Sequence, residues 1–374
     1  MAMLSALALV AGQATGLGEL RLIGLAGMVA LVIAVPFAVL PTRVDARLSV
    51  QPRHTTAGGR GRARLEVTNL LPAPLLHPTV RIPVENRQTY LRLPLLRRGR
   101  PAAEVVDVPT ERRGVVDIGP VWGTRADPLS LLCREQRWAD PVEFYVRPRI
   151  VGLQPLPPGG LHDLEGVPSD QTSMTDLAFH ALREYVPGDD LRHVHWRSSA
   201  RAGELLVRQY HDTRRSHACV VVDDARDAYL DAEDFELALQ AAASLIVRAG
   251  IDDYETALVC GVQQAFGDPG TLLDACCRAH LGGLGLLGAA RQAMTLAPDT
   301  SLLVLITGRK GGVRADETLM RAAREFPAGV RTIAISVDRP DGELRVGIGE
   351  LGGFTLTALD DLPAMLNGLA RFGR

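Results

Sequence analysis

The sequence predicts a multidomain chain: an N-terminal transmembrane helical hairpin, an antiparallel β-sandwich, and an α/β doubly wound domain. Three observations predict this order. Residues 22–40 form an uncharged apolar run, short runs of period two fill residues 44–150, and buried strand-type runs alternate with helical runs after Ser216. The chain has 374 residues and is 47% hydrophobic, which excludes wholesale disorder. We set the domain boundaries at 1–41, 42–151, 152–215 and 216–374, where the third segment combines a linker with a charged motif.

The predicted membrane segment reads LIGLAGMVALVIAVPFAVL and holds no charged or strongly polar side chain. As a helix this run spans about 28 Å, close to the thickness of the hydrocarbon core. A weaker apolar run before it predicts a hairpin that turns near Gly18, Glu19 and Arg21. A cleaved signal peptide fits less well, because no positively charged region precedes the apolar run. Arginines follow the run closely, and the positive-inside rule then places the bulk of the chain in the cytoplasm.

Basic charge gathers in the predicted sandwich, where residues 42–150 hold 19 arginines against 11 acidic residues. Runs of period two such as ARLEV at 63–67 and VEFYVRP at 142–148 predict seven or eight short strands. Basic residues beside a membrane anchor meet anionic lipid first, and no nucleic-acid-binding pattern accompanies them. We therefore expect membrane lipid as a partner and no nucleic acid.

The C-terminal part contains apolar runs such as HACVVVDD at 217–224 and SLLVLITG at 301–308, which are typical of strands buried on both faces. Helical runs alternate with them, which predicts a parallel sheet covered by helices on both sides. The sequence holds neither GxxxxGK[ST] nor GxGxxG, so it does not predict a nucleotide site. The five cysteines include no CxxC pair, which favours reduced thiols over a zinc site or a disulfide framework.

A charged and aromatic motif occupies residues 182–210, LREYVPGDDLRHVHWRSSARAGELLVRQY. Both ends of the motif are predicted to be strands. Between them we predict a turn at Pro187 and Gly188, and a helix that Asp189 caps and Gly203 ends.

This motif resembles the domain of unknown function 58 (DUF58) family of bacterial membrane-associated proteins. The matching residues are Arg183, Tyr185, Pro187, Gly188, Asp189, Arg192, Trp196, Ala200 and Arg201. The segments RRGVVDIGPV at 112–121, DPL at 127–129 and YVRP at 145–148 are similar to the β region that precedes the motif in the family. The resemblance covers nearly the whole chain and implies no established activity.

The resemblance implies a von Willebrand factor A-like C-terminal domain and a location at the bacterial inner (plasma) membrane, with the soluble domains in the cytoplasm. It also implies partners: a MoxR-type AAA+ ATPase and other envelope proteins. Domains of the von Willebrand type usually hold Mg²⁺ through Asp-x-Ser-x-Ser after the first strand, with a Thr and an Asp from later loops. Oxygen ligands of this kind suit a hard cation.

The chain departs from that metal pattern. Asp223 stands at the Asp position, but Ala225 and Asp227 replace the two Ser, and Gly308 follows Thr307 where an Asp is expected. We therefore expect no cofactor, and we keep Asp223, Asp227 and Thr307 only as weak candidates for Mg²⁺.

We predict a membrane-anchored, non-catalytic adaptor protein that works with the ATPase in cell-envelope processes. Two roles stay open for the motif: it pins the chain internally, with Trp196 as a core anchor, or it docks a partner. The motif residues to which these two roles apply are Arg183, Tyr185, Pro187, Gly188, Asp189, Asp190, Arg192, Trp196 and Arg201.

Two alternative functions are a metal-dependent adhesion-type module and an envelope hydrolase. A hydrolase would use Ser198, His195 and Asp190, but Asp190 lies five residues before His195 and points elsewhere around a helix. No GxSxG elbow occurs in the chain. A metal pair of His193 and His195 would need a strand, because positions two apart diverge on a helix.

Overall fold

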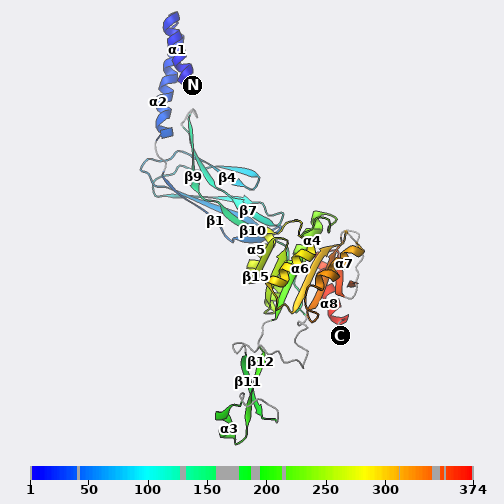
Figure 1. Ribbon diagram of the computed structural model, residues 1–374. Coiled ribbons are helices and arrows are strands. Elements are labelled where there is room, and N and C mark those ends of the chain that lie inside the picture. Colours follow the sequence, from blue (N-terminus) through cyan, green and yellow to red (C-terminus); the bar gives the residue numbers. More distant parts are fainter. Residues whose placement is uncertain are drawn as a thin grey trace. The chain divides into compact units, whose positions relative to one another are not determined.

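The computed structural model divides the chain into two units, Met1–Arg149 and Ile150–Arg374, which we describe one at a time (Figure 1). It describes residues 2–39, 43–126, 132–156, 177–186, 194–212, 216–310, 312–338, 346–348 and 351–372.

The first unit begins with the expected pair of apolar helices, α1 (Ala2–Thr15) and α2 (Gly18–Val39). The pair packs closely: a Cβ at Gly27 would lie 2.2 Å from Ser5 Oγ, and Arg21 Nε donates a hydrogen bond to Gly12 O at 2.9 Å. Among the described residues, α2 is the one helix long and apolar enough to cross a membrane, because α1 has only 14 residues.

Two β-sheets follow. The first has the strand order β1-β3-β6 and the second β2-β10-β7-β4-β8-β9, with β5 paired to β4. The strands are β1 (Val44–Val50), β2 (His54–Thr56), β3 (Gly61–Asn69), β4 (Thr79–Val84), β5 (Arg87–Arg92), β6 (Pro101–Val108), β7 (Gly114–Ile118), β8 (Val121–Ala126), β9 (Cys133–Ala139) and β10 (Val142–Arg147). Leu65 and Val67 of the first sheet share one buried core with Ile82, Ile118 and Phe144 of the second. Alternating burial along β3 explains why its sequence has period two.

One pairing in these sheets corrects the all-antiparallel expectation, because β2 and β10 run parallel. The chain leaves β1, crosses to the second sheet and reaches its edge in the direction of β10. Tyr145 N then donates to Arg53 O at 3.0 Å, and Ala57 N donates to Arg147 O at 2.9 Å. A strand of three residues is too short to show a period in the sequence.

The second unit contains a seven-stranded sheet of order β15-β14-β13-β16-β17-β19-β18. Five strands are parallel, as expected, and the two edge strands β15 and β18 are antiparallel. The strands are β13 (His217–Val222), β14 (Glu255–Cys260), β15 (Gln263–Gly267), β16 (Leu302–Gly308), β17 (Arg331–Val337), β18 (Val346–Ile348) and β19 (Leu351–Leu356).

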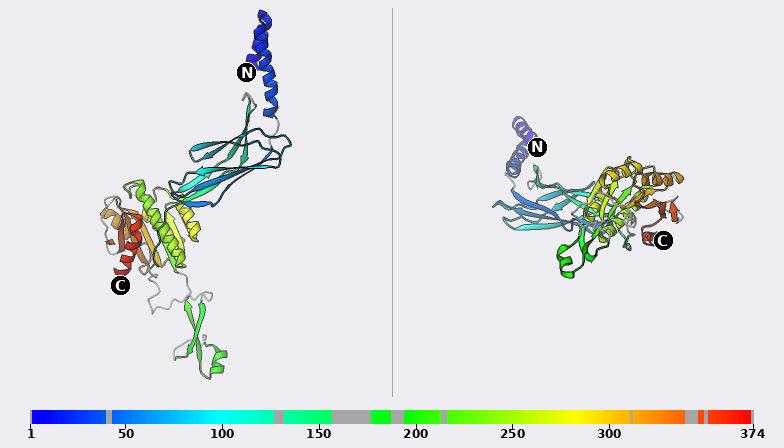
Figure 2. Two further views of the ribbon diagram at one scale, coloured as in Figure 1. Left: turned by 180° about the vertical axis from the view of Figure 1, so that it is seen from behind. Right: turned by 60° about the horizontal axis from the view of Figure 1, so that its bottom comes forward.

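Helices cover both faces of this sheet (Figure 2). Val220 and Val222 face α4 (Ala232–Ile251), α5 (Pro269–Arg278) and α8 (Leu362–Phe372), which follows the short helix η3 (Leu359–Asp361). Cys219 and Val221 face α6 (Gly285–Leu296) and α7 (Val313–Ala323). Burial on both faces explains the unbroken apolar runs. Burial also raises the pKa of the Cys219 thiol to about 12, which keeps it protonated.

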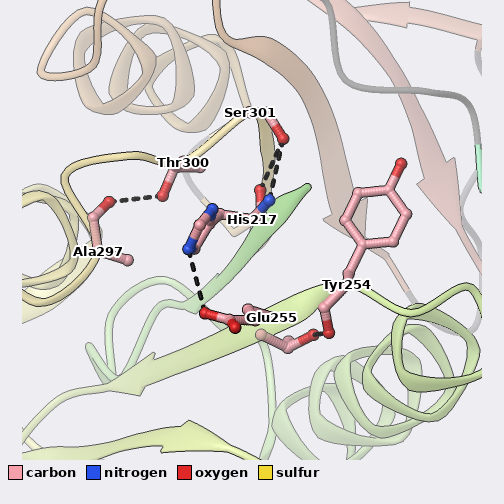
Figure 3. A network of polar contacts seen from close by, with 7 residues as sticks. His217, Tyr254, Glu255, Ala297, Thr300 and Ser301 are labelled. Atoms are coloured by element: carbon pink, nitrogen blue, oxygen red, sulfur yellow. Dashed lines mark hydrogen bonds and ion pairs between the residues drawn. The ribbon is translucent and has the colours of Figure 1, made fainter. Parts of the chain in front are cut away.

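A polar network ties the amino ends of β13, β14 and β16 together (Figure 3). His217 Nε2 lies 3.2 Å from Glu255 Oε2 on the neighbouring strand. Ser301 Oγ donates to His217 O at 3.0 Å and accepts from His217 N at 3.2 Å. These groups join neighbouring strands, and we assign them a structural role.

Residues 151–156 are held against α4, although the composition predicts a linker from residue 152 onward. Leu153 and Leu156 belong to the buried core on that face of the sheet. Leu156 N donates to Asp252 Oδ2 at 2.8 Å, and Arg248 bonds both Asp252 and Leu153 O. The hydrogen bond from Arg248 lowers the pKa of the Asp252 carboxyl. Below, residues 151–156 are called the strap.

The charged motif forms the expected strand–helix–strand unit, with β11 (Leu177–Glu184), α3 (Trp196–Ala202) and β12 (Leu206–Asp212). Gly203 ends α3 with φ 76°, as predicted. The helix start is a correction, since α3 is capped by His195 and not by Asp189. Val194 pairs with Val207, and His195 N donates to Leu206 O at 2.8 Å, so these two residues belong to the hairpin and not to the helix.

Candidate functional site

The candidate site lies at the carboxyl ends of β13 and β16. Chain order reverses there, because β14 continues the sheet on one side of β13 and β16 continues it on the other. Loops that leave neighbouring parallel strands in opposite directions create the crevice where open α/β sheets bind ligands. Asp223 and Asp224 follow β13 directly, and Thr307 lies near the end of β16.

Asp223 is buried and fully engaged within the chain. Its side chain and that of Thr307 are 3% and 2% exposed. Thr307 Oγ1 donates to Asp223 Oδ2 at 2.6 Å, and Ala225 N donates to Asp223 Oδ1 at 3.0 Å. Tyr229 Oη donates to the Asp223 carbonyl at 2.7 Å. Burial raises the pKa of the Asp223 carboxyl above its ordinary value, and the hydrogen bond from Thr307 opposes that rise.

Asp224 caps the start of α6. Gly285 N donates to Asp224 Oδ1 at 2.8 Å, and Leu284 N lies 3.4 Å from Asp224 Oδ2. A carboxylate is favourable there because the first amides of a helix lack partners and carry partial positive charge. The carboxylate needs glycine neighbours: a Cβ at Gly261 or Gly282 would lie 2.3 or 2.4 Å from Asp224 Oδ2.

A row of buried polar side chains crosses the sheet beside this aspartate pair. Thr307 is in register with Ser336 of β17, and Ser336 with Thr355 of β19. Arg309 Nη1 donates to Thr355 Oγ1 at 3.3 Å, and its Nε lies 3.7 Å from Asp338 Oδ2. Ser336 Oγ has no hydrogen-bond partner within the described part of the chain. Sequence reasoning missed Ser336 and Thr355, although a hydroxyl residue near the end of an apolar strand run was a visible signal.

The residues present do not fit a magnesium site of the von Willebrand type. Asp223 and Thr307 meet as predicted, but they bond each other, and Ala225 supplies an amide donor where a hydroxyl ligand would be needed. Asp227 lies on the exposed part of the loop, and Asp224 turns to the amides of α6. Within the described ranges, no group of three or more His, Cys, Asp or Glu could hold a metal ion.

His195 and Ser198 come together as the hydrolase alternative requires. His195 Nδ1 lies 2.7 Å from Ser198 Oγ, and it also accepts from Ser198 N at 3.2 Å. These two contacts are an N-terminal cap of α3, which gives the pair a structural role. Asp190 and His193 lie outside the described residues.

Trp196 corrects the expectation of a core anchor, because its side chain is 63% exposed. The helix that carries it has seven residues and lies beside a sheet of only two strands. Arg201 is exposed in the last turn of α3, and Tyr185 is half-buried with its amide bonded to Leu205 O at 2.8 Å. Arg183 lies on β11 opposite Val207. The other motif residues lie outside the described residues: Pro187, Gly188, Asp189, Asp190 and Arg192.

Comparison with known proteins supports the family resemblance over part of the chain. Residues 181–265 match the model of a family described as protein of unknown function DUF58. The matched range contains α3, β12, β13 and the Asp223–Asp224 pair, so it covers part of the motif and the end of the first parallel strand. No curated protein matches the chain.

Solved structures resemble only parts of the chain. A CARDB domain from Pyrococcus furiosus, in complex with di-metal ions, has 12% identity over 28% of this chain and 91% of its own, with a TM-score of 0.21. The PKD domain of an M14-like peptidase from a Thermoplasmatales archaeon has 12% identity over 28% of this chain and 98% of its own, with a TM-score of 0.20. The DNA glycosylase AlkC of Pseudomonas fluorescens has 17% identity over 34% of each chain, with a TM-score of 0.21. Similarities this distant carry no argument about function.

Proposed function

We propose that this chain is a membrane-anchored, non-catalytic adaptor of the bacterial inner membrane. In this proposal α2 crosses the bilayer, the β-sandwich and the second unit lie in the cytoplasm, and α3 with its hairpin docks a MoxR-type AAA+ ATPase that acts in cell-envelope processes. The observation that carries the proposal is the exposure of Trp196 on a capped and ordered helix.

A large, exposed aromatic side chain on a fixed helix is typical of a binding hot spot. Trp and Arg are the residue types that dominate the energy of protein–protein interfaces. Arg197 and Arg201 are exposed on the same short helix as Trp196, so aromatic area and positive charge stand together. Ser199 fixes this helix to β12, because Leu206 N donates to Ser199 Oγ at 2.9 Å. A partner with an apolar pocket and an acidic rim fits this surface.

The crevice of the α/β region supports a role without catalysis. Hydrogen bonds within the chain engage the carboxylate oxygens of Asp223 and Asp224, so both aspartates order loops. The strand order, with an antiparallel edge strand β15 beside β14, supports the von Willebrand factor A-like interpretation of this region.

Binding to the purified ATPase tests the proposal. The full chain is extracted from membranes in detergent, and its affinity for the ATPase is measured for the parent and for Trp196→Ala and Arg201→Ala. We expect Trp196→Ala to weaken binding about 30-fold, the effect of losing a hot spot of ~2 kcal/mol. Arg291→Ala on α6 is the control, because it removes only an exposed ion pair with Glu325.

Two further variants, Asp189→Ala and Arg192→Ala, probe motif residues that the sequence alone singles out. Undiminished affinity in all four motif variants, with the folds intact, would refute docking through this motif.

One observation favours a metal-dependent adhesion-type module as a second candidate. Asp223 and Thr307 come to one edge of the sheet from adjacent parallel strands, where a metal ion would have to displace the 2.6 Å hydrogen bond between their side chains. Titration calorimetry of the full chain with Mg²⁺ and Mn²⁺ separates the two proposals. The adaptor proposal predicts no binding heat at millimolar ion, whereas a heat that Asp223→Asn abolishes supports the second candidate.

A further inference from the structure

We propose that one end of the β-sandwich is a lipid-contacting surface that binds anionic headgroups. This inference rests on the membrane anchoring in the proposed function and adds a second point of contact with the bilayer. The surface consists of two neighbouring loops, 70–78 and 93–100, together with Arg43. It is called the headgroup surface below.

Asn69 fixes the two loops side by side. Its side chain is fully buried at the end of β3. Its Nδ2 donates to Ala73 O of the first loop at 2.8 Å and to Leu96 O of the second at 3.1 Å. Its backbone carbonyl accepts from Gly99 N at 2.9 Å. The backbones of the two loops are therefore held next to each other.

The first loop presents apolar side chains to the outside. It reads LLPAPLL from residue 70 to residue 76, without a charged residue. Leu75 is buried in the core at 5% exposure, but Leu70 and Leu76 are 51% and 65% exposed. These exposed leucines give the loop an apolar area that the acyl-chain boundary of a bilayer would cover.

The second loop presents positive charge next to these leucines. Arg97, Arg98 and Arg100 are all exposed, and within the described residues no ion pair involves them. The arginines on the face of the first sheet differ, because Arg64 lies 2.9 Å from Glu66 and Arg62 lies 3.6 Å from Asp107. Apolar side chains beside unpaired arginines match the boundary between acyl chains and anionic headgroups.

The length of the chain places this surface at the membrane. Leu70 N donates to Arg43 O at 3.0 Å, so Arg43 lies against the first loop. The helix α2 ends at Val39, only four residues earlier. Four residues reach at most about 14 Å. If α2 crosses the bilayer, Arg43 and the start of the first loop at Leu70 lie close to the headgroups.

The test measures how close single positions come to lipid. Cys133 is the one exposed cysteine in the described residues, so a Cys133→Ser background of the full chain accepts one label. A fluorophore is placed by Leu76→Cys on the headgroup surface or, as the control, by Glu111→Cys. Glu111 belongs to the turn at the opposite end of β3 and β6, where Thr110 Oγ1 bonds Gly59 O. Nine residues of β3 separate the two ends by about 30 Å.

Each labelled chain is reconstituted in nanodiscs of phosphatidylcholine and phosphatidylglycerol that contain headgroup-spin-labelled lipid. We expect quenching at position 76 to exceed quenching at position 111 at least threefold. Quenching at position 76 falls toward the value at position 111 when Arg97, Arg98 and Arg100 are changed to Ser, or when phosphatidylglycerol is left out.

A third label at Val29→Cys, in the middle of α2, separates failure of this inference from failure of the anchor. Quenching at 29 by lipid spin-labelled deep in the acyl chain, with equal and weak headgroup quenching at 76 and 111, refutes the headgroup surface and leaves the anchor standing. Absence of quenching at 29 refutes both. Unchanged quenching at 76 in the triple Arg→Ser variant refutes the role given to charge.

Discussion

At the residue scale, Asp223 makes folding depend on pH. Burial raises the pKa of its carboxyl in the folded chain above the ordinary value of 3.8, so the folded state binds this proton more tightly than the unfolded state. The stability from that difference is fully present below pH 3.8 and is lost as the pH rises through the folded-state pKa.

The variant Asp223→Asn keeps an acceptor for Ala225 N but cannot titrate. We expect the free energy of unfolding of the parent to fall relative to that of the variant as the pH rises from 3.8. Urea denaturation of both chains across a pH series measures the difference. A difference that stays constant across the series would contradict the raised pKa.

Two adjacent glycines provide a matched test of the space around Asp224. A Cβ at Gly282 would lie 2.4 Å from Asp224 Oδ2, whereas a Cβ at Gly283 would meet nothing within 4 Å. The amides of α6 hold the carboxylate in place, so it cannot move away freely. We expect Gly282→Ala to lower the free energy of unfolding by about 1–3 kcal/mol. Equal stabilities of Gly282→Ala and Gly283→Ala would show that the Asp224 carboxylate is not held as described.

Single residues also show where sequence reasoning stops. Asp223 and Thr307 were weak Mg²⁺ candidates only because the family resemblance implies a shared site, and their side chains do meet. The partners of Asp224 could not be predicted, because the amides of Leu284 and Gly285 lie sixty residues away along the chain. The exposure of Trp196 was missed because tryptophan side chains are mostly buried in folded proteins. Whether a given tryptophan is buried depends on tertiary contacts, which the local sequence does not show.

At the scale of elements, Ser199 is the contact that attaches α3 to its hairpin. Its hydroxyl accepts from Leu206 N at 2.9 Å and lies 3.1 Å from His195 O. Ser199→Ala therefore leaves the Leu206 amide without this acceptor. We expect hydrogen exchange of the Leu206 amide to accelerate about fivefold, the equivalent of ~1 kcal/mol for one hydrogen bond. The control Ser198→Ala should leave that amide slow, and equal rates in the two variants would argue against the attachment.

The strap gives a second prediction at this scale. Asp252 accepts from Leu156 N at 2.8 Å, and its partner Arg248 bonds Leu153 O at 3.3 Å. Asp252→Ala removes the acceptor of Leu156 N and the ion pair that orients Arg248 toward Leu153 O. We expect faster cleavage by thermolysin before Leu153, followed on gels under native conditions. Glu325→Ala removes a surface ion pair and should cleave at the parental rate. An unchanged rate in Asp252→Ala would mean that the apolar packing of Leu153 and Leu156 and the hydrogen bond from Val151 N to Ser244 Oγ hold the strap without Asp252.

Elements were predictable where a period or an unbroken apolar run extends over five or more residues. The strands β3, β13 and β16 and the helix α4 belong to this class. The parallel pairing of β2 and the antiparallel edge strand β18 were not predictable, because each strand has three residues. The start of α3 was misplaced because Asp189 is a better cap by composition than His195. The pairing of Val194 with Val207, a long-range contact, fixes the true start.

At the scale of the whole molecule, the proposed bilayer anchor comes first along the chain, the sandwich with the proposed lipid-facing loops follows, and the α/β unit with the proposed docking motif comes last. The order of these parts follows from the sequence, because each has its own hydrophobic pattern. The partner follows from the resemblance alone and waits for the binding experiment.

The anchor is the premise of the account, and extraction of membranes with alkaline carbonate tests it most directly. This treatment releases proteins that are bound only at the surface and leaves spanning helices in the bilayer. The account predicts that the full chain stays in the membrane pellet, because the window Gly18–Val35 of α2 has a mean hydropathy of 1.9 and is 11% buried within the protein. Recovery of the intact chain in the supernatant would contradict the account.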